Sequence, residues 1–145
     1  MIDAETSRKE RVLIDESVME IYRELRTDAN SQPEQSPFST NKDIFILAAC
    51  LGFRSGRRQA LPAGKKLDIR ESVFLESDLA ILKSLAIADT GDVAVLSQPG
   101  EILRIAEEYA HVGIHDVQVN LVNQRGRPLW NLVEMLNSFM SEVER

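Results

Sequence analysis

The stretch that decides the fold is TNKDIFILAACLGFRSG, which runs from Thr40 to Gly56. Thr40 and Asp43 have the spacing of a helix N-cap and its third residue, so we expect a helix to begin near Asn41. Residues 44–53 are apolar on nearly every face, which predicts a helix surrounded by other helices at the centre of the fold. Gly52 and Gly56 are where this helix is expected to end.

On the N-terminal side, apolar side chains recur at helical spacing within a charged stretch, which predicts an amphipathic helix from about Arg8 to Arg26. Residues 28–37 contain two prolines and no large apolar side chain, as is typical of a solvated linker. The length of this linker indicates a mobile or separately docked N-terminal helix. The expected organisation is an N-terminal charged amphipathic helix at 1–27, a polar linker at 28–37, and a helical domain at 38–145 with a basic loop at 54–66.

On the C-terminal side, further helices are expected at Asp78–Ala88 after an N-cap at Ser77, from Ile102 to Gly113, and from Pro128 to the C-terminus. Residues 114–123 alternate as a strand would, yet they also suit a helix. We favour the helix, because an isolated strand would have no partner. The predicted fold class is therefore all-α, a compact bundle of about five to seven helices.

Charge is distributed unevenly along the chain. The net charge is −6, which by itself disfavours nucleic acid as a partner. Between residues 52 and 70, however, six basic residues face one acid, Asp68, so this segment carries +5. Arginine and lysine in such a loop can bind phosphate oxygens, or they can cap helix ends and pair with acids of the protein itself or of an acidic partner. The candidate nucleic-acid-binding residues are Arg54, Arg57, Arg58, Lys65, Lys66 and Arg70.

Three pairs of residues could be taken for parts of a metal or catalytic site. His111 and His115 are four residues apart, but Gly113 between them is expected to break the helix, so we interpret them as surface histidines. Asp89 and Asp92 flank a glycine, as in some acidic metal motifs. A helix that ends at Gly91, followed by a turn that Asp92 caps, accounts for the same residues without a metal. Glu107 and Glu108 are interpreted as a solvated helix face.

Several classes of protein are disfavoured by what the sequence lacks. The common phosphate-loop, dinucleotide, nucleophile-elbow and zinc-protease motifs are absent, so we expect no enzyme, no metal site and no cofactor. Cys50 lies in an apolar run, where a thiol behaves as a small hydrophobic side chain. No apolar run approaches the roughly 18 residues of a membrane span, and Met1–Glu10 is charged where a signal peptide would be apolar. A cytoplasmic protein is expected.

Four segments occur in a characteristic order: FILAACLGFRSGRR at 45–58, IRESVF at 69–74, LAIADTGD at 85–92 and EEYAHVG at 107–113. On these segments the chain resembles the dnd system-associated protein 4 family, also called DNA phosphorothioation-associated protein 4. The resemblance covers roughly residues 37–113, and it includes Gly52 and Gly56. It implies a bacterial accessory protein encoded beside the machinery that replaces a phosphate oxygen of DNA with sulfur, or beside the restriction (defence) apparatus that spares such DNA. It transfers no catalytic residue.

Two functional hypotheses follow. In the first, a non-catalytic accessory protein contacts the backbone of double-stranded DNA through the basic loop. In the second, a protein-interaction subunit docks a larger component of the defence system through the N-terminal helix or the apolar stripe of residues 129–143. That stripe has more apolar side chains than one face needs, so a homodimer is also expected under either hypothesis.

Overall fold

A computed structural model describes residues 9–28 and 30–143 of the chain. These residues form five α-helices and one two-stranded antiparallel sheet, so the all-α prediction is right about the helices and wrong about the sheet. A π-helical turn at Gln118–Val122 prolongs the fourth helix. In chain order the elements are β1 (Arg11–Asp15), α1 (Met19–Leu25), α2 (Asn41–Ser55), β2 (Lys66–Arg70), α3 (Glu76–Thr90), α4 (Pro99–Val117) and α5 (Pro128–Val143).

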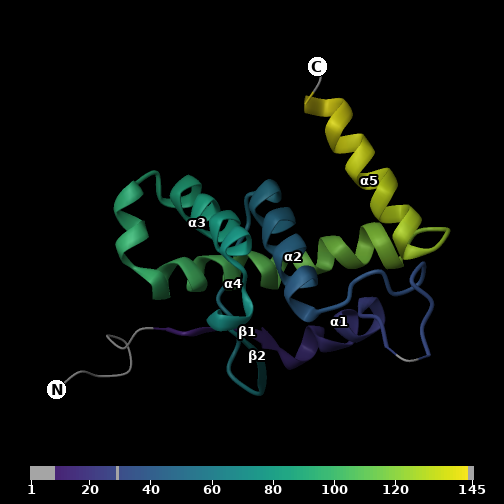
Figure 1. Cartoon of the computed structure of the whole chain (residues 1–145), viewed down its shortest axis with the longest axis horizontal. Helices are drawn as coiled ribbons and strands as arrows, with labels where there is room; N and C mark the ends of the chain where they lie inside the picture. The colour runs from purple at the N-terminus through teal and green to yellow at the C-terminus, as the bar shows by residue number, and fades with distance from the viewer. Residues whose placement is uncertain (1–8, 29, 144–145) are drawn as a thin grey trace.

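Helix α4 is the axis of the molecule (Figure 1). Helices α2 and α3 lie on one side of it, and α1 with the β1–β2 ribbon lies on the other, as both views show. Helix α5 rises from the C-terminal end of α4, on the side of α4 that carries α2 and α3. No helix in the described ranges is long and apolar enough to cross a membrane.

Small residues bring α2 and α4 into close contact. Ala48 and Gly52 on α2 are buried against the stretch of α4 that contains Tyr109 and Gly113. A Cβ added at Gly113 would lie 1.7 Å from the Ala48 carbonyl oxygen. The prediction that Gly113 ends its helix is therefore wrong, because this glycine lies within α4 and allows close packing against α2 rather than a turn.

The predicted helix ends depend on local signals, and most of them are confirmed. The Thr40 side chain accepts the N–H of Asp43, and Gly56 and Gly91 end α2 and α3 in the left-handed conformation. Helix α5 begins at Pro128 as expected. Helix α3 begins two residues earlier than predicted. Residues 114–122 are helical, which confirms the interpretation that we favoured for most of 114–123.

The N-terminal helix differs from the prediction in extent and in placement. Residues 11–15 form a strand, since the β-branched Val12 and Ile14 pair with Ile69 and Leu67 of β2. Helix α1 occupies only Met19–Leu25, and Tyr22 and Leu25 are buried in the common core. A mobile or separately docked helix is thus wrong for these residues, because their apolar side chains complete the core.

The expected linker connects α1 and α2 without regular structure, but its ends are fastened together. The backbone N–H of Thr27 donates to Phe38 O at 2.7 Å, and that of Phe38 donates to Leu25 O at 3.1 Å. The buried Ser36 donates its hydroxyl to Glu24 O. The division at 1–27, 28–37 and 38–145 stays a prediction, and residues 1–8 of its first unit lie outside the described residues.

Candidate functional site

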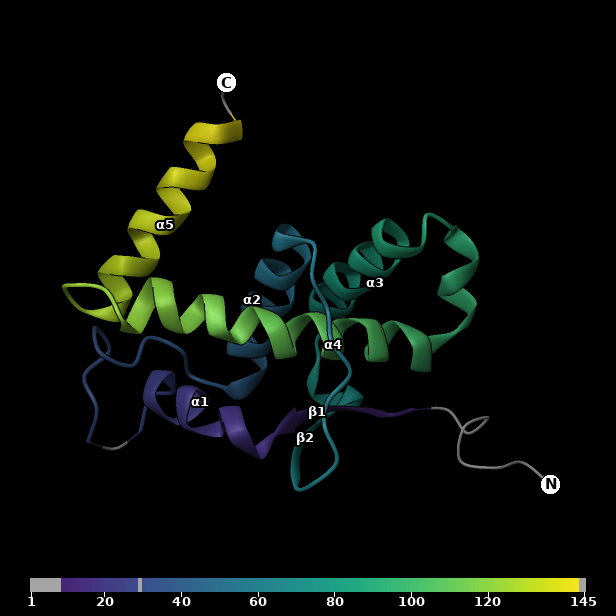
Figure 2. The same ribbon diagram turned by 180° about the vertical axis from the view of Figure 1, so that it is seen from behind.

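The basic loop does not present its cations on one surface. It leaves α2 at Gly56, crosses α4, where the N–H of Gln59 donates to Glu108 O at 3.2 Å, and enters β2 on the other side (Figure 2). Arg54, Arg57 and Arg58 therefore lie at the C-terminal end of α2. Lys65, Lys66 and Arg70 lie on the ribbon, on the opposite side of α4.

Arg58 is held by acids of the protein itself. Its guanidinium lies 3.0 Å from the Asp89 carboxylate of α3 and 3.5 Å from that of Glu108 on α4. Tyr109 donates its hydroxyl to the same Asp89 at 2.5 Å, and burial together with this bond raises the pKa of Tyr109 to about 12. The group joins the ends of α2 and α3 to the middle of α4.

Three of the four segments that carry the family resemblance meet in this ionic group. RSGRR contributes Arg58, ADTGD contributes Asp89, and EEYAHVG contributes Glu108 and Tyr109. Asp92 caps the following turn by accepting the N–H of Ala94 at 2.9 Å, as expected. The carboxylates of Asp89 and Glu108 both face the Arg58 guanidinium, so the group is an internal network of ion pairs.

Arg54 fastens α5 to α2. Its guanidinium lies over the Phe139 ring, 4.0 Å from the centroid, and forms an ion pair with Glu142. Arg57, three residues further along, is exposed and makes no ion pair with any described residue. At this end of the loop, two of the three candidate cations are engaged internally.

Lys66 is engaged in the same way on the ribbon. Its ammonium lies 3.1 Å from the carboxylate of the buried Asp15. Hydrogen bonds from Ser17, together with Lys66, lower the pKa of Asp15 to about 2. Lys65 and Arg70 are exposed, and neither pairs with an acid within 9–28 and 30–143.

Glu107 is a structural carboxylate whose role the sequence pattern does not reveal. It is buried, it accepts the backbone N–H of Leu13 at 2.7 Å, and it lies 2.7 Å from the Lys9 ammonium. It therefore satisfies one backbone N–H, that of Leu13, on the edge of β1 that β2 does not cover. The interpretation of Glu107 as solvated is wrong, and no local pattern could have corrected it, because its partners lie about a hundred positions away along the chain.

The two histidines lie on one uninterrupted helix. His111 is half-buried, and desolvation by burial lowers its pKa, whereas His115 is exposed. The expected helix break between them is wrong. Among the described residues no group of three or more His, Cys, Asp or Glu side chains could hold a metal ion. Cys50 is a free, half-buried thiol whose pKa is raised by burial.

Helix α5 carries apolar side chains on both of its faces. Met135 and the polar Asn131 are buried toward the body of the molecule, where the Asn131 amide donates to Leu121 O at 2.9 Å. The outer face exposes five large apolar side chains over four turns: Trp130, Val133, Leu136, Met140 and Val143. Trp130 is 53% exposed, Met140 59% and Val143 80%, so none of the described residues covers the outer stripe.

Fold and site together define a small helical protein with a β-ribbon, an internal ionic group and an exposed apolar helix. A family model for DNA sulphur modification system-associated protein 4 matches residues 11–144. The chain belongs to this family, and the match extends beyond the roughly 37–113 of the resemblance to include β1, α1 and α5. Neither the curated proteins nor the solved structures contain a match.

Proposed function

We propose that the protein is a non-catalytic accessory subunit of a DNA sulphur modification system, and that it docks another component of that system through the outer face of α5. The exposed stripe on α5 is the observation that carries this proposal. A helix that is apolar on both faces is normally covered on both faces. The apolar side chains of α1, the other helix considered for docking, are already buried in the core, which makes the exposed stripe of α5 the better candidate.

The charge of α5 points to the chemistry of the partner. Residues 128–143 contain Glu134 and Glu142 and no Lys, Arg or His. Glu142 is paired with Arg54, so Glu134 is the acid of α5 that has no cationic partner among the described residues. An apolar groove edged by basic side chains complements such a helix. A second copy of α5 would bring the same acids and no cation, so we favour a different protein over a homodimer.

Direct contact with DNA is the second candidate function. It is supported by Arg57, Lys65 and Arg70, which are exposed and have no acidic partner among residues 9–28 and 30–143. The other three candidate cations are bound to Glu142, Asp89 and Asp15, which reduces the charge that they offer to phosphates. This engagement is why we rank docking first.

A non-catalytic role is proposed because the carboxylates that stand close together are occupied. Asp89 and Glu108 share Arg58, and Glu107 is occupied by Lys9 and a backbone N–H. A catalytic carboxylate needs access to a substrate, and these three face the protein itself. We place the protein in the cytoplasm, where it can meet the modification system.

The test uses the purified chain and separately purified components of the modification system, analysed by size-exclusion chromatography with light scattering. The wild-type chain is expected to co-elute with one component, and W130D/M140D is expected to elute alone. Val93→Asp is the matched control, because Val93 is 68% exposed and lies on a different surface. Co-elution that survives W130D/M140D, or a homodimer lost in that variant, would contradict the proposal.

The DNA hypothesis needs different variants. Charge reversal at Arg58 would break the ionic group as well as any phosphate contact, so Arg57→Glu and Lys65→Glu are the informative changes. Under this hypothesis each variant weakens duplex binding in a gel-shift assay and lowers its dependence on salt. Unchanged binding in the double variant would remove the basic loop from consideration.

A further inference from the structure

Two arginines face each other across the β-ribbon. The register places Arg11 of β1 directly opposite Arg70 of β2. The neighbouring pair, Glu10 and Glu71, is joined by a backbone bond of 2.8 Å, and hydrogen-bonded pairs alternate with non-hydrogen-bonded ones along an antiparallel ladder. Arg11 and Arg70 thus form a non-hydrogen-bonded pair, the type in which side chains stand closest together.

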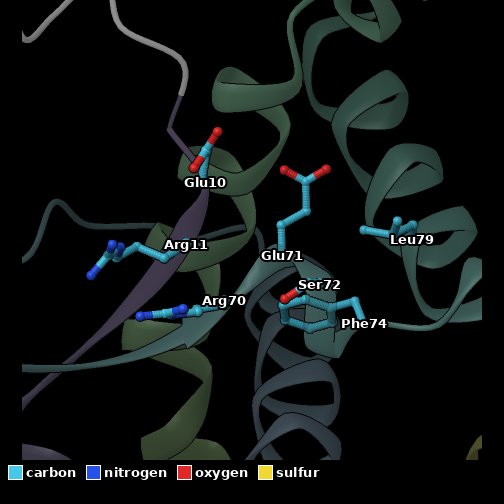
Figure 3. A pocket seen from close by; sticks show the side chains of 7 residues that line it. All are labelled: Glu10, Arg11, Arg70, Glu71, Ser72, Phe74 and Leu79. Atoms are coloured by element: carbon cyan, nitrogen blue, oxygen red, sulfur yellow. The ribbon is translucent and has the colours of Figure 1, made fainter.

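The two side chains also point the same way. Figure 3 shows both guanidinium groups extended to one side of the ribbon, while the Glu71 carboxylate points in another direction. Both arginines are exposed. A ligand from solvent can therefore contact both guanidinium groups at once.

Of the two carboxylates on this face of the ribbon, one lies beside the arginine pair. Arg11 lies 2.7 Å from Asp68, which is 38% exposed on the adjacent position of the same face. Arg70 makes neither an ion pair nor a hydrogen bond through its side chain with any described residue. The remaining charges of this face, Lys66 and Asp15, neutralise each other. The arginine pair keeps an excess positive charge.

Like charges directly opposite each other destabilise a sheet, so the pair is costly until an anion lies between its members. Guanidinium forks match the oxygens of a phosphate group, and two forks can hold one phosphate from both sides. A cavity of about 570 Å³ lies beside the pair and is lined by Phe74, Leu79 and the acidic Glu10 and Glu71 as well as by both arginines; the guanidinium groups extend away from Phe74 and Leu79, so a phosphate would approach them from solvent (Figure 3). The Ser72 hydroxyl lies in the same cavity.

We propose that Arg11 and Arg70 form a clamp that binds a phosphate group. The clamp does not depend on docking through α5, and it contains a residue, Arg11, that lies outside the basic loop. The phosphate can belong to a DNA backbone or to a free anion. The two sources share one chemistry and are distinguished by the two arms of the test.

The test measures binding of a short DNA duplex by fluorescence anisotropy, and binding of inorganic phosphate by the NMR signals of the arginine side chains. Arg70→Glu is expected to weaken binding about tenfold or more in each of the two assays that detects binding by the wild type. Arg125→Glu is the control, since it makes the same change of charge at an exposed residue in the turn before α5. Arg11→Gln is expected to weaken binding in the same assay.

Arg70→Glu also separates binding from folding. The new carboxylate would face Arg11 across the ribbon, so the melting temperature of the variant is expected to equal or exceed that of the wild type. If Arg70→Glu fails to fold, Arg70→Gln takes its place. Phosphate binding without duplex binding supports the clamp and counts against DNA contact. Binding in neither arm, or an equal loss in Arg125→Glu, overturns the clamp.

Discussion

Replacement of Gly113 by alanine tests the packing on which the fold depends. The added Cβ would lie 1.7 Å from Ala48 O and 2.6 Å from the backbone nitrogen of Gly52. Both atoms belong to the backbone of α2, so no side chain can move aside to make room. Ordinary contact begins at 3.4 Å, and α2 and α4 must therefore separate or bend before the methyl group fits.

The magnitude follows from two opposing effects. Alanine in a helix interior is about 1 kcal/mol more favourable than glycine. Overpacking a core typically costs 1 to 3 kcal/mol, and a clash with two rigid backbone atoms of α2 exceeds that range, at about 4 kcal/mol. Separation of the helices would also loosen the buried contacts of Ala48 and Ala110. We expect a net loss of about 3 kcal/mol in the free energy of unfolding, or about 10 °C in melting temperature.

The assay is urea unfolding followed by circular dichroism, with Gly91→Ala as the control. Gly91 has a φ of 70° and no atom within 4 Å of its added Cβ, so that variant bears only the conformational cost of about 1 to 2 kcal/mol. Gly113→Ala should be clearly the less stable of the two. A Gly113→Ala protein as stable as the wild type would show that helix propensity outweighs the clash, and would refute the reasoning.

Three further predictions concern charged and titratable groups. The pKa of Asp15 is lowered from 3.8 to about 2, so its ionised carboxylate stabilises the fold above about pH 4, and this contribution is lost as the pH falls toward 2. The variant Asp15→Asn should therefore show a weaker dependence of stability on pH in this range of an acid-unfolding curve. The pKa values of both tyrosines, Tyr22 and Tyr109, are raised, so the stability of the fold should decline as the pH rises above 10. Ultraviolet absorbance at pH 10 should show little tyrosinate until the protein unfolds. Arg58→Ala should cost about 1 to 2 kcal/mol and speed tryptic cleavage at Lys65, whereas cleavage at the wild-type rate would mean that the ionic group does not hold the loop.

Signals that act within one turn of helix could be read from the sequence. The Thr40 cap, the left-handed Gly56 and Gly91, and Pro128 at the start of α5 each depend on residues within a few positions of one another. The apolar run of α2 likewise predicted a central helix, and α2 packs directly against α4. For these elements local physics and the final fold agree.

Features that depend on distant partners could not be read in this way. Residues 11–15 form a strand only because β2, some 55 positions further along, supplies the other half of the ribbon. Gly113 resembles a helix stop until Ala48 is placed against it. The basic loop resembles a free cationic surface until Asp89, Glu108 and Asp15 are placed beside its side chains. The periodicity of apolar residues describes one segment of the chain at a time, whereas each of these contacts joins two segments that are distant in sequence.

The central claim is that the outer face of α5 is covered by another component of the DNA sulphur modification system. Amide hydrogen exchange, measured on the chain alone and on its complex with that component, tests which surface is covered. We predict slower exchange in residues 128–143 of the complex and unchanged exchange in α3. Unchanged exchange in α5, with new protection confined to residues 56–70, would contradict the claim and favour the basic loop as the contact.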